Sequence, residues 1–250
     1  MAAALALIAA ALVGLAGCAA PGQAPAGAGV AQPADLGVLR RATLDHYRER
    51  QASGDIVYLL EPARSDVRIY ALRAGAAARF GHNHVITVPH FSGLAHAPSK
   101  GLRGAGADLG FRLAELQVDP PALRAAIGGG FAGTLDSDAI HGTLEHLMSD
   151  AAFGAASHPW VEISASVEAG ETPVAIADVA LSLHGETHHQ RLALHVHADG
   201  QQLEISGMLA FRQGDYGVKP YAVMGGLLAV DDLVAVEFHL RGVPWQGVLP

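Results

Sequence analysis

The chain has 250 residues, of which half are apolar and 16% are charged, so a sizeable buried core is expected and the composition does not indicate disorder. Its 16 Lys and Arg against 24 Asp and Glu give a formal net charge of −8, which argues against a nucleic acid partner because phosphate binding needs clustered positive charge. The single cysteine, Cys18, excludes an internal disulfide and any zinc cluster built on several cysteines.

Residues 1–17 are predicted to be a signal peptide. The apolar run "MAAALALIAAALVGLAG" has the length of a signal-peptide core and is short and alanine-rich for a transmembrane helix. No Lys or Arg precedes this core, although signal peptides normally carry one. The run ends in "LAGC" (Leu15 to Cys18), which resembles the lipobox of bacterial lipoproteins. The alternative is an ordinary signal peptide with an incidental cysteine.

The lipobox resemblance implies that Cys18 is lipidated and becomes the first residue of the mature chain. Two or more acyl chains give stable anchoring, so the protein would be tethered to a membrane without spanning it. Ala19 follows the cysteine where Asp would be a retention signal, which under the sorting rule of Gram-negative lipoproteins implies the outer membrane. The expected location is the periplasmic side of the bacterial cell envelope.

Residues 18–53 are predicted to form a tether followed by a short helix. The stretch 19–34 is rich in Ala, Gly, Pro and Gln and has no periodicity, which is typical of a flexible linker. Within 35–52 apolar residues recur at helical spacing, and we expect a short amphipathic helix that packs on the outside of the following domain. Its apolar stripe comprises Leu36, Leu39, Leu44 and Tyr47.

Residues 54–250 are predicted to form one domain in which apolar and polar residues alternate, the pattern of strands with one dry face and one wet face. Parallel strands buried on both faces would show continuous apolar runs instead, so the sheet is expected to be antiparallel. The expected strands, about eight to ten in number, include 56–60, 66–72, 84–88, 107–116, 160–169, 174–185, 191–198, 203–212 and 233–240.

One helical insertion interrupts this pattern at about 120–150. "PPALRAAIG" has the Pro-led start of a short helix, and the following stretch places Ile140, Leu144 and Leu147 on one face of a second helix. A long antiparallel sheet must bury its dry face, which favours a sandwich or a closed barrel. The expected fold class is therefore all-β with a short helical insertion.

Five segments together resemble the YceI-like, polyisoprenoid-binding family of bacterial periplasmic proteins over about residues 56–242. The most specific match lies between Leu181 and Leu194. The segments are "IVYLLEPARSDVRIYAL", "FGAASHPWVEISAS", "VALSLHGETHHQRLAL", "GMLAFRQGDYGVKPY" and "LLAVDDLVAVEFHL". The resemblance implies an antiparallel lipocalin-like β-barrel with a long interior tunnel that holds an isoprenoid or another long-chain lipid.

The inward apolar residues of such a barrel are the candidate ligand-binding set. Each buried methylene contributes about 0.8 kcal/mol, so a long tail would be held mainly by its length. The alternative is that these side chains fill a solid core, as they do in small barrels. The candidates are Phe111, Leu113, Ile163, Leu194, Leu209, Phe211, Val236 and Phe238.

The 14 histidines raise the question of catalysis or of metal binding. No G-x-S-x-G motif is present, and "HGTLEH" spaces its histidines five apart instead of the four of H-E-x-x-H, so no enzyme is expected. His82 and His84 form an i, i+2 pair that would face one side of a strand and are the leading metal or haem candidates. His188 and His189 fit a turn, and the alternative for most histidines is a solvated or hydrogen-bonded role.

The leading hypothesis is a periplasmic lipoprotein that holds an apolar chain as a carrier, store or sensor, with no chemistry of its own. Its partners would be a long-chain lipid or isoprenoid and, through the lipid anchor, a membrane. The alternatives are a His-mediated metal- or haem-binding periplasmic protein and an interaction module with a solid core.

Overall fold

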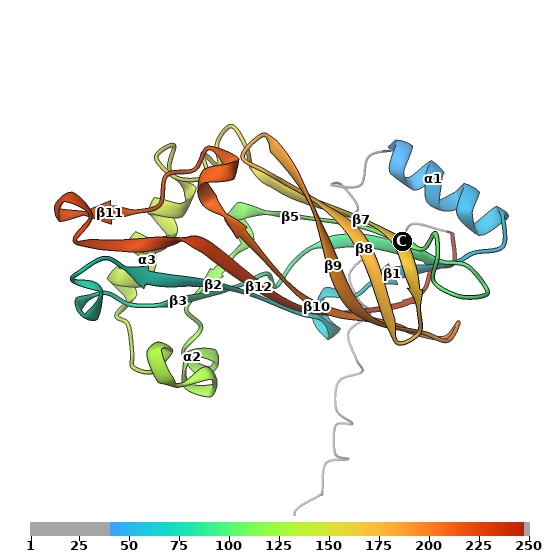
Figure 1. Ribbon diagram of the computed structural model, residues 1–250, viewed down its shortest axis with the longest axis horizontal. Helices are drawn as coiled ribbons and strands as arrows, with labels where there is room; N and C mark the ends of the chain where they lie inside the picture. Colours follow the sequence, from blue (N-terminus) through green and yellow to red (C-terminus); the bar gives the residue numbers. More distant parts are fainter. Residues whose placement is uncertain (1–40, 248–250) are drawn as a thin grey trace, which may run out of the picture. The chain divides into compact units, whose positions relative to one another are not determined.

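The computed structural model describes residues 41–247, so the predicted signal peptide, Cys18, the tether and the first residues of the expected helix, with Leu36 and Leu39, lie outside the described residues. The described chain begins with helix α1 (Arg41–Ala52), and helices α2 (Pro121–Ile127) and α3 (Ser137–Met148) interrupt a series of strands (Figure 1). The strands are β1 (Ile56–Leu60), β2 (Asp66–Ala74), β3 (His84–Thr87), β4 (Ser92–Ala97), β5 (Gly106–Arg112), β6 (Gln117–Val118), β7 (Trp160–Glu171), β8 (Val174–Leu183), β9 (Glu186–Ala198), β10 (Leu203–Arg212), β11 (Ala222–Val223) and β12 (Leu228–Pro244).

The strands form an antiparallel barrel that closes on β12. One edge of β12 pairs with β10, while its other edge pairs first with β2, from Ala229 to His239, and then with β1, from Gly242 to Pro244. β1 and β2 are thus two parts of one wall strand. The register shows the same for β3 with β4 and for β5 with β6. The barrel therefore has eight wall strands, which confirms the expected lipocalin-like fold class.

Period-two alternation places apolar side chains inside the barrel. On β9, Leu194 and Val196 are buried, whereas His195 and His197 are exposed on the outer face. The β9–β10 pairing covers only 195–198 against 203–206. Beyond it, Tyr216 of the short helix η6 (Gln213–Tyr216) packs its ring against His188 and Phe211, with ring centroids 4.8 and 5.5 Å apart. Tyr216 thus fills the wall where the two strands are not paired.

Strand β4 was not among the expected strands. All of its six residues are buried, and its inward face carries only Gly93, Ala95 and Ala97, so the sequence shows no large apolar residues in alternation. The outer face of β4 is covered by α1. Tyr47 of α1, Val57, Leu94 and Trp245 form a small apolar cluster outside the barrel. The short helix expected within 35–52 is confirmed over Arg41–Ala52 and packs on the outside of the barrel as predicted.

Buried polar contacts fix α1 in place. The Tyr47 hydroxyl lies 2.8 Å from the Leu94 carbonyl oxygen and 2.9 Å from Oδ2 of Asp108. His96 Nδ1 lies 2.8 Å from Oδ2 of Asp55, and the same oxygen is 2.6 Å from Nη2 of Arg50. Burial lowers the pKa of His96 from its ordinary value of 6.5; Asp55 opposes this effect, and the Arg50 charge adds to it. His96 is therefore held neutral at the α1 interface.

Helices α2 and α3 lie between β6 and β7. Asp136 caps α3, with its side chain accepting a 2.7 Å hydrogen bond from the Ala139 amide. Ile140, Leu144 and Leu147 pack on the barrel core, as their spacing predicted. Figure 1 shows α3 toward the end of the barrel where β11 lies, and α1 at the opposite end. The two ends of the barrel are therefore covered by different helices.

We expect Tyr47→Phe to lower the free energy of unfolding by about 1–3 kcal/mol, because it removes a buried hydroxyl that contacts both the Leu94 carbonyl oxygen and the half-buried Asp108 carboxylate. Glu49→Gln, on the exposed face of the same helix, should change it by less than about 0.5 kcal/mol. Urea unfolding followed by tryptophan fluorescence measures both. Equal midpoints for the two variants would contradict the proposed anchoring of α1.

We also expect the stability to fall as the pH drops below 6.5, with His96 as a main contributor. In that range the unfolded chain takes up a proton that the buried His96 does not, so protonation favours the unfolded state until the lower pKa of folded His96 is passed. Urea titrations between pH 7.5 and 5 should show a weaker pH dependence for His96→Gln. Equal pH dependence of the parent chain and His96→Gln would contradict this role of His96.

Candidate functional site

The barrel interior contains an apolar cavity of about 540 Å³. All eight candidate residues line it: Phe111, Leu113, Ile163, Leu194, Leu209, Phe211, Val236 and Phe238. Seven come from β5, β7, β9, β10 and β12, and Leu113 lies in the turn that follows β5. These residues therefore surround an open interior, and that they bind a ligand there stays a prediction.

Small residues help to shape this interior. Gly207 of β10 faces inward, and a Cβ there would lie 2.8 Å from Cζ of Phe238 and 2.9 Å from Cδ2 of Leu194. The glycine thus lets the Phe238 ring lie across β10. Below the cavity, on the α1 side, the buried side chains of Tyr58, Leu203, Ala175 and Ala177 belong to the packed core and do not line the cavity. The barrel is therefore solid toward one end and hollow toward the other.

The polar side chains that line the cavity are few. Lys219 and Tyr221 both line it and are exposed to solvent, so the cavity reaches the surface beside them. The His146 ring on α3 packs edge-on against Tyr221, with ring centroids 4.7 Å apart, so α3 and the chain before β11 together border this opening. The polar lining residues are His84, Thr143, His146, Gln213, Lys219 and Tyr221.

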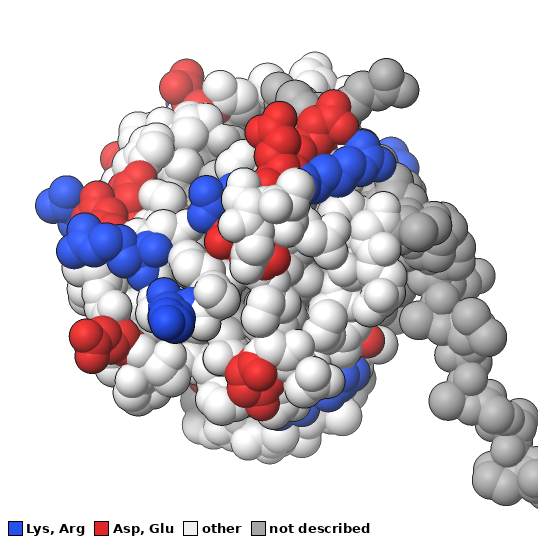
Figure 2. Space-filling model, turned by 90° about the vertical axis from the view of Figure 1, so that its right-hand side faces the viewer, with Lys and Arg blue, Asp and Glu red and all other residues white. Residues whose placement is uncertain are grey.

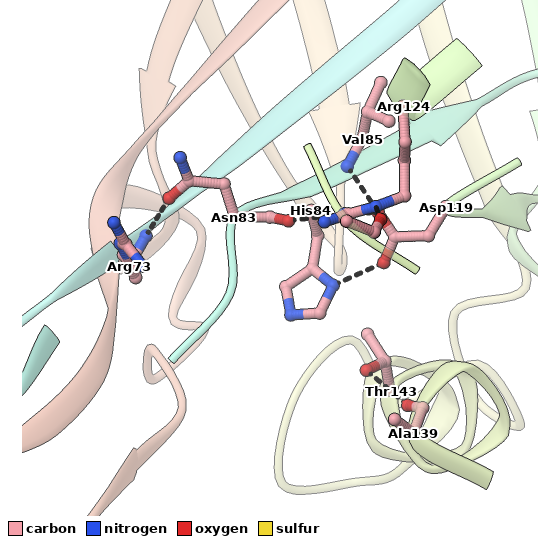
Figure 3. A network of polar contacts seen from close by, with 9 residues as sticks. Arg73, Asn83, His84, Val85, Asp119, Arg124, Ala139 and Thr143 are labelled. Atoms are coloured by element: carbon pink, nitrogen blue, oxygen red, sulfur yellow. Dashed lines mark hydrogen bonds and ion pairs between the residues drawn. The ribbon is translucent and has the colours of Figure 1, made fainter. Parts of the chain in front are cut away.

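His84 is held by a buried carboxylate (Figure 3). Its Nδ1 lies 2.6 Å from Oδ2 of Asp119, whose Oδ1 accepts hydrogen bonds from the Val85 amide at 3.0 Å and from Nη1 of Arg124 at 2.6 Å. Asp119 and Arg124 are both buried. Burial alone would raise the pKa of Asp119, but the His84, Val85 and Arg124 hydrogen bonds outweigh it and hold that pKa below its usual value. Asp119 is therefore ionised, and it orients His84.

Arg124 also joins the helical insertion to the barrel. Its Nη1 donates to the Asn83 carbonyl oxygen at 2.7 Å, next to the start of β3 (Figure 3). Because Asp119 follows β6 and Arg124 lies in α2, one ion pair fixes the point where the chain leaves the wall. The His84 ring points from this ion pair toward α3, with Nε2 facing away from Asp119 (Figure 3). His84 therefore offers one nitrogen to the cavity.

The two metal candidates have different surroundings. His84 is largely buried and lines the cavity, whereas His82 precedes β3, is exposed and is not among the lining residues. Within residues 41–247, no group of three or more His, Cys, Asp or Glu side chains is arranged to hold a metal ion. The metal or haem prediction thus gains no support from the geometry of these two residues.

Several other histidines have structural contacts. His188 and His189, expected in a turn, lie within β9, because the turn is limited to the His184–Gly185 step where both residues have positive φ. Nδ1 of His184 lies 2.9 Å from the Tyr216 carbonyl oxygen, which supports a structural part at the strand end. His189 pairs with Asp178 on the outer face.

The sequence analysis missed His146, Lys219, Tyr221, Asp119 and Arg124. Lys219 is one of only two lysines in the chain, and this rarity is a signal that could have marked it as a candidate site residue. Asp119 and Arg124 carry no periodic signal, since they become neighbours only through the path from β6 into α2. The site thus combines a wall that alternation predicts with a polar end that it does not.

These features define an antiparallel β-barrel with a hollow apolar interior. The volume of its cavity is within the usual range for ligand pockets. The YceI-like domain model matches residues 58–241, and the chain belongs to this family.

Comparison with solved structures supports the fold. The crystal structure of BcnA from Burkholderia cenocepacia matches with a TM-score of 0.54 and 12% identity, covering 73% of this chain and 98% of that one. A crystal structure of the Campylobacter jejuni YceI protein matches with a TM-score of 0.47 and 11% identity, covering 64% of this chain and 85% of that one. No curated protein sequence matches the chain. Among the described residues, no helix has the length and apolar character needed to cross a membrane.

We expect Asp119→Asn to lower the free energy of unfolding by about 3–5 kcal/mol, because it leaves the buried Arg124 charge without its partner. Arg124→Met should also destabilise. The double variant should be more stable than the sum of the two losses predicts, because neither charge is then left alone. Urea unfolding of the four chains forms a double-mutant cycle, and additive losses would contradict the coupling.

Proposed function

We propose that this protein is a lipid-tail-binding protein of the bacterial periplasm, anchored by a lipid at Cys18. The observation that carries the proposal is the hollow apolar interior of about 540 Å³, which opens to solvent beside the exposed Lys219 and Tyr221. Family membership supports an isoprenoid or another long-chain lipid as the ligand. The protein would act as a carrier, store or sensor and would perform no reaction on the chain it holds.

The affinity for a ligand would come from the area of contact between its apolar chain and the wall of the cavity. Ten buried methylenes alone would contribute about 8 kcal/mol of gross transfer free energy. The cost of ordering a flexible tail offsets part of that gain, so pocket length and fit select the ligand more than any single contact does. Apart from His84 and Gln213, the largely buried part of the lining is apolar, which favours an unbranched or isoprenoid hydrocarbon there.

The polar opening accounts for the orientation of the ligand. Lys219, His146 and Tyr221 stand where the cavity meets solvent, so the polar group of an amphipathic lipid would lie beside them and its tail would extend toward Leu194 and Phe238. A lipid anchor at Cys18 would keep such a barrel near its source of ligand. The lipobox pattern and Ala19 support this location at the outer membrane.

Two matched substitutions, each of an alanine by tryptophan, test the proposal. Ala165 lines the cavity, whereas Ala193 faces outward on β9, so Ala165→Trp fills the interior and Ala193→Trp does not. Native mass spectrometry and organic extraction of gently purified protein should find bound lipid in the parent chain and in Ala193→Trp. Ala165→Trp should contain at least about tenfold less, since it removes contact with several methylenes.

Circular dichroism must show that Ala165→Trp keeps the barrel, since overpacking costs about 1–3 kcal/mol. A parent chain without extractable lipid, or equal lipid content in the two variants, would refute the proposed function.

A further inference from the structure

Two loops at the end of the barrel opposite α1 expose large apolar side chains. Among the described residues, Met224 at 74% and Phe80 at 68% are the most exposed large apolar side chains, and Leu227 is 48% exposed. Phe80 ends the short helix η3 (Ala78–Phe80), and Met224 begins η7 (Met224–Gly226), which joins β11 to β12. Exposed groups of this kind mark a binding surface when they are contiguous.

Backbone contacts hold the two loops together. The Ala77 amide donates a 2.7 Å hydrogen bond to the Leu227 carbonyl oxygen. Gly75 has a φ of +89°, and a Cβ at this position would lie 2.4 Å from the same oxygen, so only glycine allows this approach. Figure 1 shows the loop between β2 and β3 beside the turn between β11 and β12. Residues 75–81 and 221–227 therefore form one surface, here called the tip surface.

The segments that carry the tip surface have charges of a single sign, and the nearest acidic residues in sequence are Asp215, Asp231 and Asp232, which flank 217–230. The segments 71–83 and 217–230 contain Arg73, Arg79 and Lys219 but no Asp or Glu, although the chain has 24 acidic residues. The Arg79 guanidinium lies 4.4 Å from the centre of the Phe80 ring, which places a cation directly beside an exposed aromatic group. By contrast, the end that carries α1 shows acidic and basic side chains interspersed (Figure 2).

The tip surface adjoins the cavity opening. Tyr221, which is 44% exposed, belongs to the tip surface and also lines the cavity. Lys219 lines the cavity two residues earlier, and Val230, which pairs with the Tyr221 carbonyl oxygen through its amide, lines it as well. A partner bound to the tip surface would therefore stand directly at the opening.

We propose that the tip surface docks onto a lipid bilayer that contains anionic phospholipids and thereby places the cavity opening at the membrane interface. Phe80, Met224 and Leu227 would enter the boundary between headgroups and acyl chains, while Arg73, Arg79 and Lys219 would contact lipid phosphates. The inference rests on the proposed lipid-binding function, because a tail that leaves a bilayer at this point avoids crossing water. A bilayer fits better than a protein partner because the surface combines aromatic, methionine and cationic groups at the mouth of an apolar cavity.

A tryptophan reporter in the full-length chain tests this proposal independently of any lipid anchor. Met224→Trp places the reporter on the tip surface, and Met208→Trp places it on the outer face of β10, where Met208 is also exposed, at 60%. Each chain is mixed with vesicles of phosphatidylcholine and phosphatidylglycerol whose acyl chains carry bromine. Interfacial side chains lie about 5–10 Å deep, within reach of the quencher.

We expect bromine to quench Met224→Trp roughly twofold more than the parent chain, which already carries Trp160 and Trp245, whereas Met208→Trp should match the parent. Arg79→Glu in the Met224→Trp chain should weaken the quenching, as should omission of phosphatidylglycerol or addition of salt. Equal quenching of the two reporters would overturn the proposal. So would a concentration-dependent blue shift of Met224→Trp that requires no vesicles, since this result would assign the surface to a second copy of the chain.

The lipid content of the same preparations separates the two proposals. Extractable lipid without quenching at position 224 overturns docking at the tip surface and leaves the cavity function standing. Quenching at position 224 in a chain that never contains lipid supports docking and refutes the cavity function.

Discussion

The pairing of both edges of β12 is the constraint on which the rest of the structure depends. A sheet of this length has two edges with unpaired backbone groups, and each unpaired group that is buried is costly. The 17 residues of β12 pair with β10 along one edge and with β2 and then β1 along the other. One edge of β12 therefore serves two partners in turn, and the short helix η2 (Pro62–Arg64) interrupts the wall between β1 and β2.

The interior of the barrel is packed with side chains toward one end and hollow toward the other. Toward α1, Tyr58, Leu203 and small residues such as Ala175 fill the interior. Toward α3, the wall is lined by side chains that do not meet across the barrel, and a helix borders the space in place of a packed core. The Asp119–Arg124 ion pair fixes that helical insertion at the point where it leaves β6. A binding cavity thus coexists with a stable fold because the two requirements are met at different ends.

Alternation in the sequence predicted antiparallel strands and the apolar wall, whereas the choice of a lipocalin-like barrel over a sandwich came from the family resemblance. Phe111, Ile163, Leu194 and Phe238 sit on faces that period two assigns without knowledge of the strand order. β4 escaped the same rule because its inward residues are the small Gly93, Ala95 and Ala97, and because the face that α1 covers mixes Leu94 with Ser92 and His96.

The polar contacts depend on long-range geometry and could not be predicted in this way. Tyr47 and Asp108 are 61 residues apart, and His84 and Asp119 are 35 apart. Neither pair belongs to a local motif, because each joins a strand of the wall to a segment outside it. The histidine count pointed toward metal chemistry, whereas His184, His188 and His96 make contacts that hold strands, turns and α1 together.

The surfaces at the two ends of the barrel also differ in the apolar side chains that they expose to water. At the α1 end, charged groups form ion pairs with each other, as Arg50 does with Asp55, and the apolar outer face is covered by the helix. At the other end, apolar side chains stay exposed on loops that glycines hold in close contact, and the segments that carry the cations there contain no Asp or Glu. Leaving Phe80 and Met224 in water forgoes burial that is typically worth about 1.5–3 kcal/mol for each such side chain. An apolar interior opens beside this surface, so the hydrophobic effect that would draw a lipid tail into the barrel would also draw these loops toward the membrane that supplies the tail.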